Sequence, residues 1–330
     1  MLVRLDHVAN WLAPSCRVDL RVRMVVALVS VSAALLISTA AAAGDWPKGH
    51  VVHENSESPD RQFGVVVPGP EEADDASEDS NEANYLANLK THELLGKIAD
   101  ADYFERQNHR DLYVIWSADS KACVVDYEGR FGFDRISVLQ LKGSGFEQTD
   151  LGARIEKALA AVVGEEGTGS AWFRFAPNNK LLVRAVCYTG NPKLMDENSK
   201  QARFAGTFDL NSKKWIASEA HKTEDWDALR ALYSEPSAVF IAPGGDQSKV
   251  PENFTGTIVS SEDEKAQTVD QDMNEVYKNL RVVLPPARFA KVHQEQVAWL
   301  KKRDAAKSVE EKSKLTEERT RALRDVVWSR

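Results

Sequence analysis

A weak internal repeat does most to limit how this chain can fold. Three polar turns, at residues 58–62, 117–121 and 176–180, lie 59 residues apart. Each precedes an apolar run, at residues 63–67, 122–127 and 181–188. Pro, Asp, Asn and Ser favour tight turns, and β-branched residues favour the strands that follow. We therefore expect three units that each begin with a turn and a strand.

A second element follows in each unit and predicts a hairpin between later strands. It lies at residues 88–91, 140–143 and 209–212. Units of several strands at such a period are typical of propeller-like proteins, and the turn at residues 116–121 resembles the strand-opening turns of propeller blades in exported bacterial proteins. A closed propeller needs about four or more blades. We therefore expect a partial or open β assembly, or a related layered β fold.

Two short helices are predicted beside these strands. One carries Leu151, Ile155, Leu159 and Val162 and ends at Gly164. The other begins near Thr223 and carries Trp226, Leu229 and Leu232. Both are expected to cover a sheet. The acidic segment at residues 71–82 lacks the alternating ligands of a calcium loop and is expected to be a solvated loop.

The pattern becomes helical near the C-terminus. An apolar stripe of Met273, Val276, Tyr277, Leu280 and Leu284 stops at the two prolines 285 and 286. A second helix follows, and a third is expected after residue 307, because Ser308 and Glu311 have capping-box spacing. A single long helix is the alternative.

The second of these helices carries an unusual stripe of apolar and polar residues. Phe289, Val292, Gln296, Trp299 and Arg303 recur at steps of three and four, so they share one helix face. An amide and a guanidinium on such a face need hydrogen-bond partners, because burying them unpaired costs a few kcal/mol each, to an order of magnitude. Either these residues join neighbouring helices, with Arg303 paired to a carboxylate such as Asp272 or Asp325, or they contact a protein partner.

This stretch also resembles a known family. The segment Gln-x-Ala-Trp-Leu-x-x-Arg-Asp at residues 296–304, with flanking matches over about residues 268–328, resembles the LprI-type lysozyme-inhibitor domain. The resemblance implies a small exported helical module that binds a lysozyme, with Gln296, Trp299, Arg303, Lys301 and Lys302 as candidate binding or structural residues. Family members commonly carry cysteines that flank the helices, whereas Ala305, Ala306 and Lys307 stand here. The helices must then be held by packing or by docking on the β-rich region.

The N-terminus has the layout of a secretory signal peptide. Arg17, Arg21 and Arg23 precede an apolar run at residues 24–37 and small residues at 40–43. We expect cleavage before Gly44, and an uncleaved membrane anchor is the alternative. The mature chain would keep Cys123 and Cys187. Strand alternation predicts that their sulfurs point to opposite sides, which favours two buried thiols, with a disulfide as the alternative.

Charge and motifs exclude several function classes. A formal net charge of −8 makes nucleic acid an unsuitable partner. The sequence has no Gly-x-Ser-x-Gly elbow and no His-Glu-x-x-His, and the glycines at residues 164–169 lack a phosphate-loop lysine. His50 and His53 lie in a lead expected to be disordered, and His109 is expected to be a packed residue. We therefore predict no catalytic, cofactor or metal site.

Together these features predict an α+β protein with a β-rich domain of three propeller-blade-like units and a small helical C-terminal domain. The expected divisions are a signal peptide at 1–43, a lead at 44–57, the β-rich domain at 58–235, a linker at 236–267 and the helical domain at 268–330. The predicted function is non-catalytic binding of a protein partner, such as a lysozyme, by a periplasmic or secreted protein. A structural or sensory envelope protein whose β domain binds a ligand is the alternative, and a hydrolase is the least favoured. The oligomeric state stays open.

Overall fold

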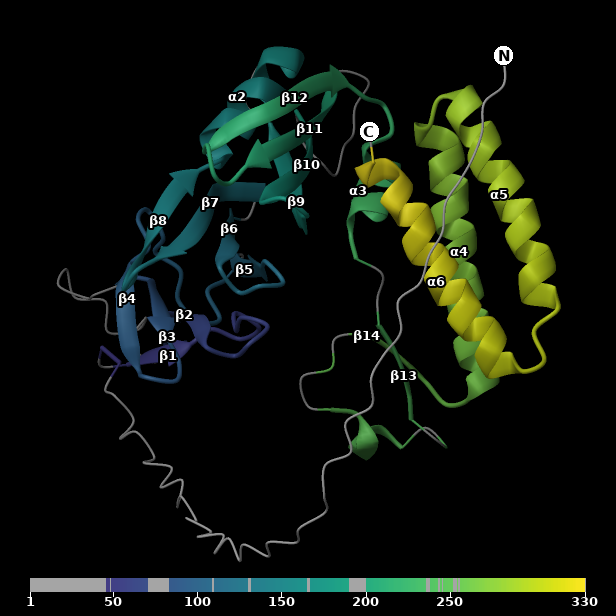
Figure 1. Ribbon diagram of the computed structural model, residues 1–330, viewed down its shortest axis with the longest axis horizontal. Coiled ribbons are helices and arrows are strands. Elements are labelled where there is room, and N and C mark those ends of the chain that lie inside the picture. Colours follow the sequence, from purple (N-terminus) through teal and green to yellow (C-terminus); the bar gives the residue numbers. More distant parts are fainter. Residues whose placement is uncertain are drawn as a thin grey trace, which may run out of the picture. The chain divides into compact units, whose positions relative to one another are not determined.

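Twelve of the fourteen strands in the described part of the chain form three successive antiparallel meanders of four strands each (Figure 1). The computed structural model describes residues 46–329, apart from residues 48, 71–82, 109, 130–131, 165–166, 190–199, 236–237, 243, 245, 252–253 and 255. The predicted signal peptide, the acidic segment at 71–82 and His109 lie outside the described residues. All described residues belong to one compact unit, Ala41–Arg330.

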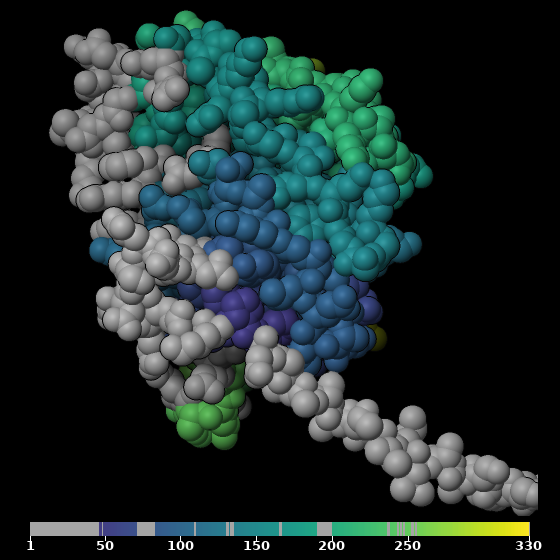
Figure 2. Space-filling view, turned by 90° about the vertical axis from the view of Figure 1, so that its left-hand side faces the viewer, coloured from purple at the N-terminus to yellow at the C-terminus, as the bar shows by residue number. Residues whose placement is uncertain are grey.

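Each meander runs from one strand to its neighbour in chain order. The first contains β1 (His50–Val52), β2 (Phe63–Pro68), β3 (Tyr85–Asn88) and β4 (Glu93–Lys97). The second contains β5 (Asp111–Trp116), β6 (Ala122–Gly129), β7 (Gly132–Lys142) and β8 (Gly145–Asp150). The third contains β9 (Thr168–Ala176), β10 (Lys180–Tyr188), β11 (Gln201–Asp209) and β12 (Lys214–Lys222). Figure 2 shows one face on which purple, blue and teal segments follow one another in this order.

The strand-opening turns have the geometry that their sequence predicts. The hydroxyl of Ser58 donates to Asp60 and accepts from the backbone N–H of Phe63, and the turn beginning at Ser117 has the same pair of bonds 59 residues later. Residues 61, 120 and 179, at the same spacing, have left-handed φ angles of 54°, 58° and 55°. The hydroxyl and carboxylate thus satisfy the backbone of a sharp turn before β2 and β6.

The prediction of a disordered lead is wrong at His50–Val52, because these residues form β1 and pair with β2. His50 and His53 are both buried. The sequence did not predict this strand because three residues are too few to show a strand pattern. The strand is ordered by tertiary contacts, through its hydrogen bonds to the neighbouring strand.

The second and third meanders are joined into one eight-stranded sheet through β7 and β9. Gly132 of β7 lies opposite Gly169 of β9, and this parallel pair is the one register pair between the two strands among the described residues. Gly132 has a φ of 120°, and a Cβ added there would lie 2.0 Å from the carbonyl oxygen of Gly169. A side chain at residue 132 would therefore force the two strands apart.

The third meander is covered on both faces by helices, as predicted. On one face, α2 (Gly152–Val163) packs on Leu181, Val183 and other alternate residues of β10. On the other face, Val186 packs against Leu229 of α3 (Trp226–Tyr233) and against Trp328. Burial on both faces explains why β10 is an almost unbroken apolar run.

The predicted linker contains regular structure that its sequence did not indicate. β13 (Ala238–Ile241) pairs in parallel with β14 (Gly256–Val259), and a short 3₁₀ turn, η2 (Gln247–Lys249), lies between them. The description of residues 236–267 as an irregular linker is therefore wrong for these strands. Prolines and glycines concealed two strands of only four residues, which gain stability from packing beside α4.

Three helices complete the chain: α4 (Glu262–Val283), α5 (Pro286–Asp304) and α6 (Val309–Trp328). Leu284 and Pro285 separate the first two, and Pro286 begins α5. Ser308 caps α6 by accepting a hydrogen bond from the N–H of Glu311, as the capping box predicts. The alternative of one long helix is therefore wrong, and the predicted fold class, a β-rich part followed by a helical part, is confirmed.

The two cysteines are buried and unbridged. Cys123 lies in the core cluster shared by the first two meanders, whereas Cys187 lies in the cluster beneath α2. The prediction of two buried thiols is confirmed. Burial raises the pKa of the Cys187 thiol to about 11 and raises that of Cys123 further, so neither is a ready thiolate nucleophile.

Candidate functional site

The predicted polar stripe of α5 faces the other two helices. Val292 and Gln296 are buried there, while Phe289, Trp299 and Arg303 are half-buried. Met273, Val276 and Leu280 of α4 and Leu323 of α6 form the apolar core that this stripe covers. The stripe therefore joins helices, and its side chains are mostly withdrawn from solvent.

Gln296 is the centre of a buried polar link across the three helices. It is only 6% exposed. Its amide Nε2 donates to the sulfur of Met273 on α4 at 3.1 Å, and its Oε1 accepts from Nε of Arg319 on α6 at 2.9 Å. Burial lowers the pKa of Arg319, and Glu295 lies 3.8 Å from its Nη1 and opposes that shift. One amide thus satisfies groups from both neighbouring helices.

Arg303 makes a second link, close to the C-terminal end of α5. Its Nη1 lies 3.2 Å from Oδ1 of Asp270 on α4, and Thr316 of α6 donates its hydroxyl to the same oxygen at 3.2 Å. The guanidinium also stacks over the ring of Trp299, 5.3 Å from its centroid. The prediction that Arg303 pairs with Asp272 or Asp325 is wrong. Asp272 binds Arg324 and Asp325 binds Arg174. Two residues of a helix span about 200°, so Asp272 faces away from the side of α4 on which Asp270 binds Arg303.

Two further arginines, Arg324 and Arg288, join the helices to one another and to the segment after α3. Arg324 of α6 donates to Asp272 of α4 at 2.9 Å and to the carbonyl of Ser234 at 2.8 Å. Arg288 of α5 donates to the carbonyl oxygens of Val326 and Ser329 at the end of α6, at 2.5 and 2.6 Å. No signal within either helix alone could have identified these partners, because they come from segments far away in the sequence.

The other side of α5 is exposed and basic. Lys301 and Lys302 are both exposed, and no ion pair of either is present among the described residues. Val297, one turn before Lys301, is 43% exposed. Of the predicted candidates, the structure thus brings Gln296, Trp299 and Arg303 together in the helix interface and leaves the two lysines at the surface.

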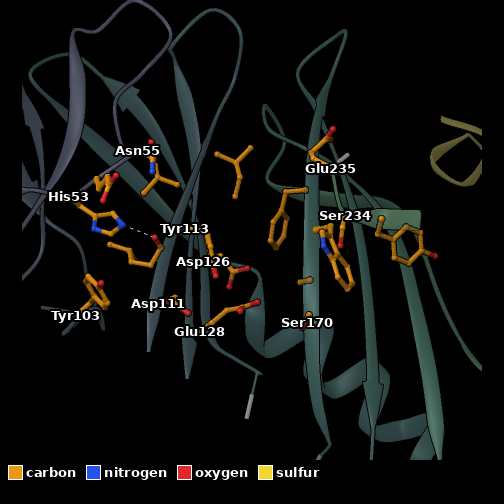
Figure 3. A pocket seen from close by; sticks show the side chains of 18 of the residues that line it. His53, Asn55, Tyr103, Asp111, Tyr113, Asp126, Glu128, Ser170, Ser234 and Glu235 are labelled. Atoms are coloured by element: carbon orange, nitrogen blue, oxygen red, sulfur yellow. Dashed lines mark hydrogen bonds between the residues drawn. The ribbon is translucent and has the colours of Figure 1, made fainter. Parts of the chain in front are cut away.

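A second candidate site, missed by the sequence analysis, is an acidic cleft of about 690 Å³ (Figure 3). It is bordered by β5, β6, β9, α3 and the end of α6. Its carboxylates are those of Glu54, Glu105, Asp111, Asp126, Glu128 and Glu235, and its aromatic residues include Tyr103, Tyr113, Trp172, Tyr233 and Trp328. A signal was present, because the apolar run of β6 ends with two acids at i and i+2, on one strand face.

His53 lies at one end of this cleft with both ring nitrogens bonded. Nδ1 lies 2.5 Å from Oε1 of Glu105, and Nε2 lies 2.7 Å from the carbonyl oxygen of Leu112. Burial lowers the pKa of His53, but these two acceptors and the charges of Glu105 and Glu54 outweigh it, so the net pKa is raised. Both acceptors are satisfied only by the imidazolium.

Other chemistries considered from the sequence have little support in the geometry. Gly164 ends α2 in a left-handed conformation, with a φ of 87°, and does not begin a helix as a phosphate loop does. Within the described ranges, no group of three His, Cys, Asp or Glu side chains is arranged to hold a metal ion. In the same ranges, none of the helices is both long and apolar enough to cross a membrane.

Comparison with known proteins bears on the helical part. The family model described as Lysozyme inhibitor LprI matches residues 252–323, which contain β14, α4, α5 and most of α6. The resemblance predicted from the segment around Trp299 is therefore confirmed. A search of curated proteins finds no match to this chain. All five predicted candidate residues lie within the matched range, and every residue that lines the acidic cleft lies outside it.

Proposed function

We propose that this protein is a non-catalytic binding protein of the cell envelope, and that its helical part binds and inhibits a lysozyme. The observation that carries the proposal is the match of the lysozyme-inhibitor family to residues 252–323, which span the helices α4, α5 and α6. The proposal includes export to the periplasm or the outside, with residues 1–43 removed as a signal peptide. It also includes a division into a β-rich domain, which begins at β1 and not at residue 58, and a helical domain at 268–330.

The outward side of α5 is the surface assigned to the partner. Gln296 and Arg303 are occupied by bonds to α4 and α6, so they position α5 and are poorly placed for a partner. Val297 and Lys301, at i and i+4, share the exposed side, with Lys302 beside them. Lysozymes cleave their substrate with paired carboxylates. A lysine-bearing helix complements such a cleft.

A wall-lysis assay with the full chain tests this assignment. The unmodified protein should slow lysis of bacterial cell walls at near-stoichiometric concentrations. The double variant Lys301→Glu/Lys302→Glu should raise the concentration needed by about tenfold or more, since like charge now faces the carboxylates. Its melting temperature should stay nearly unchanged, because exposed substitutions usually alter stability by under about 0.5 kcal/mol.

The matched control reverses two exposed lysines on another helix. Lys312→Glu/Lys314→Glu makes the same charge change on α6 and should leave inhibition unaltered. An equal loss of inhibition in both double variants would show a general effect of charge and would reject the outward side of α5 as the binding surface. No slowing of lysis by the folded protein, against any lysozyme class, would reject the inhibitor function.

A second candidate function has an observation of its own. The acidic cleft has a volume of about 690 Å³, within the range of small-molecule sites, roughly 300–1,000 Å³. This favours the alternative of an envelope protein whose β-rich part binds a ligand. In that case the helices would serve association with another protein.

A further inference from the structure

The carboxylates of the acidic cleft come from two paired strands. Glu128 of β6 lies opposite Asp111 of β5, and Asp126 lies opposite Tyr113. Because strand residues two apart share a face, all four side chains project from the same side of this ladder. Figure 3 shows Asp111, Asp126 and Glu128 gathered on one wall of the cleft, across from Ser170 and Ser234. The pairing thus concentrates negative charge at one place.

Asp126 has no partner within the described protein to explain its burial. It is 3% exposed and lines the cleft, and its Oδ1 atom is buried without a hydrogen bond. Buried carboxylates are normally hydrogen-bonded or paired, because an unmatched one is costly. A ligand-binding site commonly has a few polar groups at its wall whose hydrogen-bond partner is the ligand.

The opposite wall is aromatic and suits a cation. Trp172, Tyr233 and Trp328 form a continuous series, with ring centroids 5.5 and 5.9 Å apart. The faces of such rings attract ammonium and guanidinium groups. One of these rings already binds a cation within the protein, since the guanidinium of Arg174 lies 4.7 Å from the ring centroid of Trp328.

The positive groups of the cleft do not neutralise Asp126. His53 is bonded to Glu105 at the far end. Arg230 of α3 acts on Glu128, where its charge opposes the effects of burial and of Asp111 on the pKa of that carboxyl. Arg106 is the remaining lining arginine. Of the six carboxylates, Glu105 is bonded to His53 and Glu235 lies 3.6 Å from the guanidinium of Arg174. No ion pair of Asp111 or Asp126 is present among the described residues, so the unbalanced negative charge lies around these two.

We propose that the acidic cleft binds a small organic cation, whose ammonium or guanidinium group lies against Asp126 and whose apolar part lies along Trp172 and Tyr233. Asp126 supplies the free acceptor, Asp111 and Glu128 supply the surrounding negative charge, and Tyr113 contributes a ring beside them. The assignment concerns the β-rich part and does not depend on lysozyme inhibition by α5.

The electrostatics of the free cleft agree with this assignment. Burial, and then the negative charge of Glu128, raise the pKa of Asp126 well above its ordinary value. Burial together with Asp111, Glu128 and Asp126 raises the pKa of Tyr113 to about 12. Burial is the main cause of both shifts and neighbouring negative charge adds to it, so a bound cation would lower both pKa values.

Titration calorimetry with agmatine as the probe tests the proposal on the full chain. Agmatine carries a guanidinium and an ammonium on a short apolar chain, and it should bind saturably at one site. Glutarate, an anion of similar length, and 1,5-pentanediol, which is neutral, should not bind. Asp126→Asn, which keeps the shape and removes the charge, should weaken agmatine binding at least tenfold. The control Glu318→Gln removes an exposed carboxylate of α6 and should leave binding unchanged.

A second variant guards against a folding defect in the first. Tyr113 is 48% exposed, so Tyr113→Leu should fold, and the loss of its ring should weaken agmatine about threefold or more. Equal affinity of the unmodified protein and folded Asp126→Asn for agmatine would overturn the proposal, as would equal binding of pentanediol. Tighter binding of a blocked arginine tripeptide than of agmatine would instead indicate that the cleft binds a protein side chain, and would reject a small molecule as its ligand.

Discussion

The guanidinium of Arg184, on β10, donates a hydrogen bond of 2.8 Å from Nη2 to the carbonyl oxygen of Trp328, at the end of α6. Its Nε donates to the preceding carbonyl, of Val327, at 3.3 Å, and the guanidinium stacks on the Trp328 ring at 5.3 Å. The last carbonyls of a helix lack intrahelical partners and carry partial negative charge. A strand of the third meander thus caps the final helix of the chain.

Replacing Arg184 should therefore destabilise the whole protein. Arg184→Met keeps the apolar stem and loses the charged donors, at an expected cost of about 2–4 kcal/mol in the free energy of unfolding. Denaturant unfolding followed by tryptophan fluorescence measures this cost. Arg135→Met is the matched control, because Arg135 is exposed and reaches Asp100 only at 3.6 Å, so it should cost less than about 1 kcal/mol. Equal costs would refute the capping role.

The same contacts predict that the helical part folds poorly by itself. A fragment of residues 260–330 would lose Arg184, Leu229 and Tyr233, which cover Trp328, and the carbonyl of Ser234, which binds Arg324. A unit of this size buries little surface and usually needs bridges. Circular dichroism should show partial helicity and a broad melting curve. A sharp cooperative transition at high temperature would show that the three helices need no support.

Gln296 and Arg319 should behave as a coupled pair. Gln296→Leu leaves the Nε donor of Arg319 without its acceptor in a half-buried interface, at an expected cost of about 1–3 kcal/mol. The double variant Gln296→Leu/Arg319→Leu removes both polar partners and should recover much of that loss. Chemical denaturation of the two single variants and the double variant gives the coupling energy. Strict additivity would mean that the bond contributes nothing.

The turn and cap chemistry explains why much of the fold could be predicted from the sequence. Local signals such as Ser58, Ser117 and Ser308 act through bonds within five residues, so a short segment contains the whole cause. The partner of Arg303 and the position of β1 are set by segments that are distant in the sequence. The same holds for the acidic cleft, because Asp126 meets Trp172 and Tyr233 only after three separate segments have packed.

The raised pKa of His53 predicts that the folded protein loses stability as pH rises into the alkaline range. Its folded pKa is raised above the ordinary value of about 6.5, so the stability from the imidazolium is fully present below that pH. It is lost as pH rises through the folded pKa. Melting temperatures between pH 5.5 and 9 should fall for the unmodified protein and fall less for Glu105→Gln, which lacks the charged acceptor. His221→Gln, at an exposed histidine, should leave the slope unchanged.

The raised pKa of Asp126 predicts a second variant whose stability, relative to the unmodified protein, improves as pH rises. The folded pKa of Asp126 lies above its unfolded value of about 3.9, so between these two values only the folded state holds the proton. The stability contributed by that proton is full below the unfolded pKa and disappears as pH rises through the folded pKa. Asp126→Asn cannot titrate and should escape this decline.

The measurement is the difference in melting temperature between Asp126→Asn and the unmodified protein from pH 4 to pH 8. Any cost of burying the amide is constant across this range, so the slope alone reports the carboxyl group. The groups that face it are Glu128, Asp111 and Tyr113 from the ladder and Arg230 from α3. The difference should grow in favour of the variant with rising pH. A flat difference would show that Asp126 is ionised and satisfied in the folded protein, which would leave the acidic cleft without its free acceptor.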